Sequence, residues 1–461
     1  MAGTKIVVLD DDPTGSQTVH GCLLITRWDE ATLREALLDE APLFFVLTNT
    51  RGADARGAAE TTRDACRRLK SVLEELARDG RAIEPIMISR SDSTLRGHYP
   101  VETDVIAEEL GPFDAHFLIP AFIEGGRITR EGVHYVLVAG AAVPVNETEF
   151  ARDPMFGYRH AFLPDWVEER THGRIRAGQV VRFSLSDVRG GSLQRLLGLR
   201  GNVVCAVDAE RHEDLAAFAA DLRSAVRRGK RFLCRGAAGI VGALAGLGPQ
   251  PVAAEDMRRY VRGERPGAVL VGSFVGKTTG QLHRLLAEPD VVPIEVDVRR
   301  LPDQAASLRA TALERIGTAY TQGLSPVIFT TREEVNFDDE RARLGFGEAV
   351  SSLLMDVIRG LPADVGFLIS KGGTTSNDVL SHGLGLRTAR VLGQIVPGCS
   401  VVRCADDHPR FPGLPVVIFP GNVGDDQSLA TAYRRLAGSV GDLELRRQPA
   451  AGTPGPSRRT H

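Results

Sequence analysis

The chain has 461 residues, 43% of them hydrophobic and 25% charged, which is typical of a globular protein with large buried cores. Its formal net charge of −3 offers no electrostatic reason to bind nucleic acid or an anionic membrane surface. No apolar stretch approaches the roughly 20 residues of a membrane-spanning helix, and the amino terminus has no signal-peptide pattern. The six cysteines are scattered without C-x-x-C pairs, so we expect a cytoplasmic protein without disulfides or a metal–thiolate site.

Short aliphatic runs alternate with longer amphipathic stretches along most of the chain. Runs bounded by turn residues predict buried strands, at Lys5–Leu9, Phe44–Leu47, Pro85–Ile88, His116–Ile119, Asn202–Val207, Arg231–Cys234, Ala268–Gly272, Pro326–Thr330, Gly366–Ile369, Ser400–Arg403 and Pro415–Phe419. The amphipathic stretches predict helices at Asp54–Ala77, Asp214–Arg228, Ala305–Tyr320, Arg341–Ile358 and Asp425–Leu436. This alternation is typical of α/β proteins, so we expect mainly parallel sheets flanked by helices.

The segment 246–267 is rich in glycine and proline at both ends, which predicts a linker between two domains. Residues 1–245 then form the first domain and residues 268–440 the second. From Arg446 onward the chain has no large apolar residue, so we expect residues 441–461 to be a disordered tail.

Three consecutive carboxylates, Asp10, Asp11 and Asp12, follow the first predicted strand. Open α/β sheets bind their ligands at the carboxyl ends of the strands. Like charges packed this closely repel, so they need a cation, a polyol or hydrogen-bond donors beside them. The cluster therefore predicts a site, and the alternative is an acidic turn that caps a helix.

Polar residues also follow the next two predicted strands. Arg51 lies after Phe44–Leu47, and the loop after Pro85–Ile88 carries guanidiniums, a carboxylate and hydroxyls, namely Arg90, Ser91, Asp92, Ser93, Thr94 and Arg96. Arg can hold a carboxylate with two hydrogen bonds, while Asp and Ser bind hydroxyl groups. The three loops together predict a shared pocket for a sugar acid.

The second half has glycine-rich turns after its strands instead. They begin at Gly272, Gly372 and Gly421, and the first is one residue too short for a Walker P-loop. Paired glycines let the backbone approach a phosphate, and neighbouring hydroxyls can bond it or reach a magnesium ion. Three such turns in one domain predict a nucleotide site.

Two other interpretations stay open. Asp10 to Thr14 also fits the D-x-D-x-T motif of haloacid-dehalogenase-like phosphatases, in which Asp10 would attack phosphorus and Asp12 would act as acid and base. That interpretation leaves the segments 89–98 and 372–375 without a role. A non-catalytic sensor would bind sugar acid and nucleotide without turnover.

Taken in order, these segments resemble the four-carbon acid sugar kinase family from about residue 4 to residue 437. The shared segments of the first half are DDPTG at 11–15, DSTLRG at 92–97, PAF at 120–122, GR at 126–127 and GVHYV at 132–136. Those of the second half are Gly272-Ser273, Gln281, GGTT at 372–375 and PGNVG at 420–424. Their consistent order makes the resemblance much more specific than any single motif.

The resemblance implies an amino-terminal substrate-binding domain and a carboxyl-terminal nucleotide-binding domain, with the active site in the cleft between them. The implied reaction is phosphorylation of the terminal hydroxyl of a sugar acid such as threonate, erythronate or 3-oxo-tetronate by ATP with Mg²⁺. Substrate binding is implied for Asp11, Asp12, Arg51, Arg90, Ser91, Asp92, Ser93, Thr94 and Arg96. ATP binding is implied for Ser273, Gly372, Gly373, Thr374, Thr375 and Gly421.

In this interpretation Asp12 or Asp11 is the base for the terminal hydroxyl, and one of the arginines at 51, 90 and 96 holds the substrate carboxylate. The chain departs from the family at Thr374, where an acidic residue is common, and at Lys371, which precedes the glycines. Lys371 is expected either to neutralise phosphate charge or to be solvated. The sequence leaves open the metal ligands and whether the protein forms a homodimer.

Overall fold

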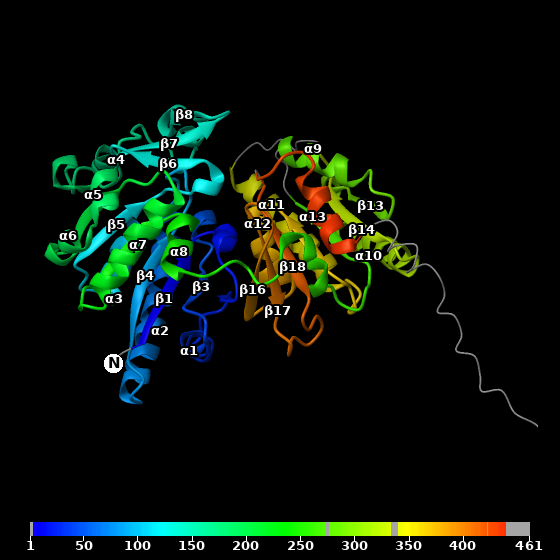
Figure 1. The fold of residues 1–461 in the computed structure, drawn as a ribbon. Helices are drawn as coiled ribbons and strands as arrows, with labels where there is room; N and C mark the ends of the chain where they lie inside the picture. The colour runs from blue at the N-terminus through cyan, green and yellow to red at the C-terminus, as the bar shows by residue number, and fades with distance from the viewer. Residues whose placement is uncertain (1–2, 273–275, 333–339, 422, 439–461) are drawn as a thin grey trace, which may run out of the picture.

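The structure, a computed structural model, describes residues 3–272, 276–332, 340–421 and 423–438. Within these ranges fifteen strands pair into one sheet that runs through both halves of the molecule (Figure 1). Their order across the sheet is β13-β14-β12-β15-β18-β17-β16-β2-β3-β1-β4-β11-β5-β10-β9. Helices flank the sheet in each half, so the predicted α/β class with mainly parallel strands is confirmed.

The amino-terminal half of the sheet is entirely parallel. Its strands are β1 (Gly3–Asp10), β2 (Leu23–Ile25), β3 (Leu43–Leu47), β4 (Ile83–Arg90), β5 (Ala115–Ile119), β9 (Val181–Phe183), β10 (Val203–Val207) and β11 (Phe232–Gly236). Its helices are α1 (Glu30–Leu38), α2 (Ala55–Arg78), α3 (Val101–Leu110), α4 (Leu163–Arg170), α5 (Leu185–Gly190), α6 (Leu193–Gly198), α7 (His212–Val226) and α8 (Ala238–Ala245). A separate antiparallel sheet contains β6 (Arg127–Arg130), β7 (Val133–Val138) and β8 (Ala141–Pro144).

The carboxyl-terminal half has a parallel part and an antiparallel part. The parallel strands are β12 (Ala268–Val271), β13 (Val291–Val296), β14 (Ser325–Thr330), β15 (Leu368–Lys371) and β18 (Pro415–Phe419), and the antiparallel ones are β16 (Thr388–Val396) and β17 (Cys399–Cys404). The helices are α9 (Gly276–Leu285), α10 (Ala305–Thr321), α11 (Glu340–Arg359), α12 (Gly373–Asp378) and α13 (Ser428–Ala437). The segment proposed as a linker contains the 3₁₀ helix η7 (Ala254–Tyr260), whose Met257 packs into the core of this half.

The two halves are joined by hydrogen bonds between strands. β2 pairs with β16 in the antiparallel sense, with Leu24 opposite Ala389. A cluster of buried apolar side chains also continues from Ile6 and Phe45 in the first half to Leu270 and Leu354 in the second. The sequence motifs predict two separate sheets and do not indicate this seam.

Local sequence accounts for the burial of β1 and for the start of α2. Residues 5–10 of β1 are buried on both faces, as expected for a central parallel strand with an aliphatic sequence. α2 starts where the Asp54 carboxylate accepts a hydrogen bond from the backbone N–H of Gly57, a standard amino-terminal cap. Its buried positions include Ala58, Ala65 and Leu69, which recur at helical spacing and face the sheet. The loop between β3 and α2 is therefore held at both ends.

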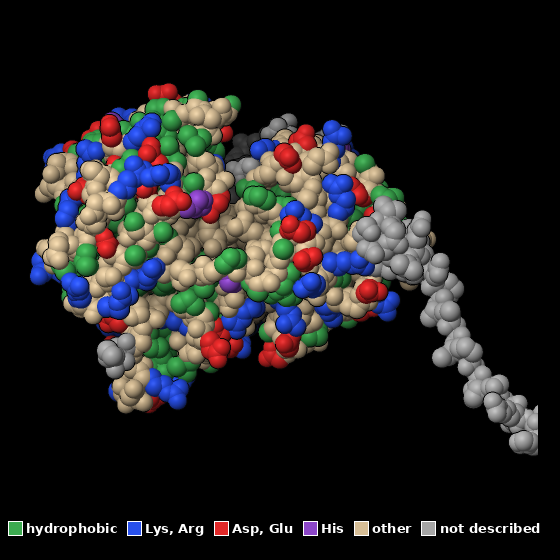
Figure 2. All heavy atoms as spheres, in the orientation of Figure 1, with side chains coloured by type: hydrophobic (Ala, Val, Ile, Leu, Met, Phe, Trp, Pro, Cys, Tyr) green, Lys and Arg blue, Asp and Glu red, His purple; other side chains and the backbone are tan. Residues whose placement is uncertain are grey.

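Over the described residues of the face in Figure 2, basic and acidic side chains are interspersed in both halves. Among the helices that the structure describes, none is both long enough and apolar enough to cross a membrane.

Candidate active site

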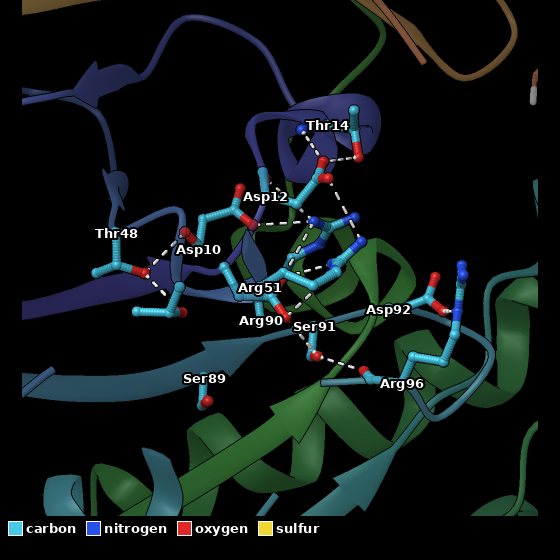
Figure 3. A network of polar contacts seen from close by, with 12 residues as sticks. Asp10, Asp12, Thr14, Thr48, Arg51, Ser89, Arg90, Ser91, Asp92 and Arg96 are labelled. Carbon is cyan, nitrogen blue, oxygen red and sulfur yellow. Dashed lines mark hydrogen bonds and ion pairs between the residues drawn. The ribbon is translucent and has the colours of Figure 1, made fainter. Parts of the chain in front are cut away.

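Four adjacent strands, β3, β1, β4 and β11, end at the same edge of the sheet because they run parallel. The polar side chains that follow them form one network of hydrogen bonds and ion pairs (Figure 3). It includes Asp11, Asp12, Arg51, Arg90 and Ser91. The structure thus brings these predicted residues together, although three separate loops contribute them.

Asp10 lies beneath this network. Its side chain is fully buried, and Oδ1 accepts a hydrogen bond from Arg90 Nη1 at 3.0 Å. Burial raises the pKa of Asp10 to about 7, because the attraction of Arg90 does not fully offset the loss of solvent. A Cβ at Gly15 would overlap the Asp10 carboxylate, so the turn 11–15 must close directly over it. Asp10 is therefore a buried partner of Arg90 and does not face a ligand.

Asp11 is held from two sides. Arg51 Nη2 donates to its Oδ1 at 2.5 Å, and Ser91 Oγ donates to its Oδ2 at 2.7 Å. Only 2% of the Asp11 side chain is exposed. Asp11 therefore fixes the relative position of the loops after β1, β3 and β4.

Asp12 is the aspartate that a ligand can reach, because 19% of its side chain is exposed. Its Oδ1 accepts a hydrogen bond from the Thr14 backbone N–H at 2.8 Å, which caps the 3₁₀ helix η1 (Pro13–Thr18). Arg51 Nη1 lies 3.4 Å from its Oδ2. Burial alone would raise the pKa of Asp12, but Arg51, Arg90 and the bonds from Thr14 outweigh it and lower the pKa. Asp12 is thus an ionised, oriented carboxylate at neutral pH.

Arg235, which the sequence motifs do not indicate, supports this network from β11. Its guanidinium is buried, donates to Ser89 Oγ at 2.6 Å and to Ser91 Oγ at 2.8 Å, and is ion-paired with Glu102 of α3. Arg235 follows the apolar run of β11 just as Arg90 follows that of β4. A charged residue at the end of a buried strand is the signal that could have identified it.

The loop 91–96 forms a second group beside the first (Figure 3). Asp92 accepts hydrogen bonds from Thr94 Oγ1 and from Arg96 Nε, the latter at 2.8 Å. Its pKa is lowered: burial opposes ionisation, but Arg96 and Arg51 outweigh it. The Ser93 carbonyl accepts a hydrogen bond from the buried His134 at 2.8 Å, so the loop is anchored to the small sheet through its backbone. Asp92, Thr94 and Arg96 are therefore placed beside Arg51 as one polar wall.

The glycine-rich turns of the second half line a cavity of about 400 Å³. The predicted residues in its wall are Gly372, Gly373, Thr374, Thr375 and Gly421, and Gly272 joins them. Apolar residues of α11, among them Val350 and Leu354, form the opposite wall. Ser273 lies outside the described residues. A Cβ at Gly272 would overlap the side chain of Thr375, so glycine is required where these two turns touch.

Lys371 is buried, so the expectation of a solvated lysine is wrong. The side chain is fully buried rather than solvated, and its Nζ donates to the carbonyls of Pro420 at 2.5 Å and Gly421 at 3.0 Å. Nζ also lies 4.4 Å from the centre of the Phe419 ring. Among the described residues no carboxylate comes within ion-pairing distance of it. Lys371 therefore ties the end of β15 to the turn after β18, beneath the cavity.

The buried ammonium predicts a pH dependence of stability. Burial lowers the pKa of Lys371 to about 7. Lys277 lowers this pKa further, whereas Cys399 raises it. Because this pKa lies below the ordinary value of 10.5, the folded protein binds fewer protons than the unfolded chain between pH 7 and 10.5. The group's contribution to the free energy of unfolding should therefore increase with pH, by about 2 kcal/mol from pH 7 to pH 9.

Urea unfolding of the wild type and of Lys371→Met at pH 6, 7.5 and 9 measures this contribution as the difference in the free energy of unfolding between the two proteins. A difference that stays constant over this range would contradict the buried, unpaired ammonium.

The polar network of the first half meets the cavity of the second half at Asp12. A Cβ at Gly373 would lie 3.1 Å from Asp12 Oδ2, so the carboxylate packs directly against the turn that lines the cavity. η1, which Asp12 caps, contacts α12, β16, β17 and β18. Ser16 of η1 donates to Ser400 Oγ at 3.0 Å in the buried interface. The predicted site residues thus form two groups that touch across the interface of the halves.

Comparison with known proteins assigns the two halves separately. The family model of a sugar-binding N-terminal domain matches residues 6–244, and that of a nucleotide-binding C-terminal domain matches residues 268–429. The chain belongs to the four-carbon acid sugar kinase family. The family assignment confirms the resemblance seen in the sequence motifs.

Relatives within this family are named as kinases of small sugar acids. A D-threonate kinase of Cupriavidus necator is 26% identical over 84% of this chain and 90% of the relative. A 3-oxo-tetronate kinase of the same organism is 27% identical over 76% of this chain and 78% of the relative. A D-erythronate kinase of Heliobacterium modesticaldum is 29% identical over 47% of each chain, so the match spans about half of that relative. A crystal structure from Salmonella typhimurium LT2 shares the fold, with a TM-score of 0.68 and 19% identity over 94% of this chain and 100% of that chain.

Proposed function

We propose that this protein is an ATP-dependent kinase that phosphorylates the terminal hydroxyl of a four-carbon sugar acid such as threonate, erythronate or 3-oxo-tetronate. In this proposal residues 1–245 bind the sugar acid and residues 268–440 bind the nucleotide. The observation that carries it is the contact between Asp12, on a sugar-binding loop, and Gly373, in the wall of the cavity assigned to the nucleotide. In this proposal the phosphoryl group is transferred between the two halves at this point.

Asp12 and Asp11 have different roles in this proposal. Asp12 is partly exposed and ionised, so it can accept a hydrogen bond from the terminal hydroxyl, orient it and take its proton as the oxygen bonds to phosphorus. Asp11 is too buried to do this and instead holds Arg51 and Ser91 in place. Phosphoryl transfer depends mainly on alignment and charge neutralisation, which Arg51 and the backbone of the glycine turns can supply.

Mg²⁺ fits this arrangement as an ion carried by the nucleotide. Among the described residues no group of three His, Cys, Asp or Glu side chains could hold a metal by itself. Mg²⁺ in kinases is bound largely by phosphates and water, with one or two carboxylates from the protein. Asp378 lines the cavity, so it would supply one such carboxylate. The bound ion would neutralise phosphate charge.

The phosphatase interpretation requires Asp10 to attack phosphorus, and its burial behind Gly15 argues against that role. We expect Asp10→Asn to keep its ATP-dependent activity within about tenfold of the wild type, whereas loss of a nucleophile would abolish turnover. Steady-state rates of the two proteins with ATP and sugar acid measure this. A wild type that releases phosphate from phosphorylated sugar acids, and a folded Asp10→Asn protein that does not, would favour the phosphatase.

A coupled assay of ADP formation with ATP, Mg²⁺ and a panel of four- to six-carbon sugar acids tests the proposal as a whole. We expect at least one four-carbon acid to stimulate ADP formation strongly. The proposal is wrong if no acid does so while phosphorylated acids lose phosphate. It is also wrong if acids and nucleotide bind without turnover, which is the behaviour of a sensor.

A further inference from the structure

The guanidiniums expected to hold the substrate carboxylate are already engaged by carboxylates of the protein. Arg51 is paired with Asp11, and Arg90 with Asp10. Arg96 bridges Asp92 and Asp153, at 2.8 and 3.4 Å. Arg235, which the motifs did not indicate, is paired with Glu102. A substrate carboxylate that displaced any of these partners would leave a buried charge unpaired, which is costly.

Arg127, the first residue of β6, is different. None of the carboxylates that the structure describes lies within ion-pairing distance of its guanidinium. Its Nη1 donates to the carbonyl of Gly125, and its Nε is buried without a partner. The side chain is half-buried, and burial lowers its pKa, although a guanidinium remains charged at any physiological pH. Arg127 is therefore a desolvated cation that still lacks an anion.

Arg127 lies beside the substrate loop. Its guanidinium carbon is 5.9 Å from the centre of the Phe150 ring, and that of Arg96 is 5.1 Å from the same centre. The charges of Asp92, Arg96 and Glu149 all act on it. His134, which donates a hydrogen bond to the Ser93 carbonyl, has its pKa lowered by burial and also by the charge of Arg127. The unpaired cation thus adjoins the wall formed by Asp92 and Arg96.

We propose that Arg127 binds the carboxylate of the sugar acid and thereby selects acids over neutral polyols. This inference rests on the proposed kinase function and names the end of the substrate that lies away from the phosphoryl group. The carbon chain would run from Arg127 past Asp92, which binds a hydroxyl, to Asp12 at the reacting end. Arg51, Arg90 and Arg96 would then keep their carboxylate partners and hold the pocket in shape.

The test compares an acid with its neutral amide, for example threonate and threonamide. We expect the wild type to prefer the acid by about a hundredfold or more in kcat/KM, because a half-buried cation without an ion-pair partner favours an anion over a neutral group. Arg127→Met should lose most of this preference and raise KM for the acid, while KM for ATP stays unchanged. Arg127→Lys should recover part of the preference, since it keeps the charge but loses the two-point geometry.

The matched control is Arg130→Met, at the other end of β6, where the exposed side chain pairs with Glu210 at 3.2 Å. It should behave as the wild type. If the wild type phosphorylates no sugar acid, the proposed function itself is wrong. If the wild type is active and folded Arg127→Met keeps the acid-to-amide preference, the role of Arg127 alone is overturned. Should Arg127→Met fail to fold, Arg127→Lys decides, and an unchanged preference and KM in it overturn the inference.

Discussion

Replacing Asp12 with Asn is expected to lower kcat by about a thousandfold, because general-base and orienting carboxylates typically contribute 10²- to 10⁴-fold. Asn can still accept the hydrogen bond from the Thr14 backbone N–H, so the cap of η1 and the fold should survive. KM for ATP should change little, since Asp12 borders the cavity only at Gly373. The measurement is the steady-state rate of ADP formation at saturating ATP and sugar acid.

Asp10→Asn is the matched control for this experiment, because it makes the same chemical change at a buried neighbour. We expect a much lower kcat for Asp12→Asn than for Asp10→Asn. If Asp12→Asn turned over within threefold of the wild type, Asp12 would be neither base nor orienting group, and the contact with Gly373 would be structural only.

Replacing Gly97 with Ala should have the largest effect on stability, about 3 kcal/mol of unfolding free energy. Gly97 has a φ of +122°, and a Cβ there would overlap Ser91 Oγ, lie 2.8 Å from Arg235 Nη2 and lie 3.1 Å from Asp11 Oδ2. The new methyl group must therefore break the network that holds Asp11. Activity toward the sugar acid should fall together with stability.

Urea unfolding of Gly97→Ala and Gly80→Ala separates the clash from the backbone strain. Gly80 also has a positive φ, +76°, but a Cβ there meets no atom within 4 Å. We expect Gly80→Ala to lower the free energy of unfolding by about 1 kcal/mol. Equal losses of unfolding free energy in the two variants would mean that the network of Ser91, Arg235 and Asp11 is not tightly packed.

Much of the architecture could be predicted because local sequence carries the signal. The aliphatic runs at Lys5–Leu9 and Pro415–Phe419 are buried strands, and the amphipathic stretch from Asp54 is the long helix α2. Polar residues after parallel strands were expected to converge, and Asp11, Arg51 and Ser91 do.

What escaped prediction depends on partners far away in the chain. The short strand β2 exists because it pairs with β3 and β16, and its three residues carry little periodicity of their own. The burial of Lys371 follows from the carbonyls of Pro420 and Gly421, about fifty residues later. Whether an arginine is free or ion-paired, as at Arg127 and Arg96, is likewise decided only when the chain has folded.

The β2–β16 seam has a consequence for the autonomy of the two halves. If the chain were cut in the segment 246–267, the first half would expose the unpaired edge of β2 and the second half that of β16. Exposed strand edges with unsatisfied backbone groups pair readily with other chains. We therefore expect each half expressed alone to self-associate, and the intact chain to unfold in a single cooperative transition.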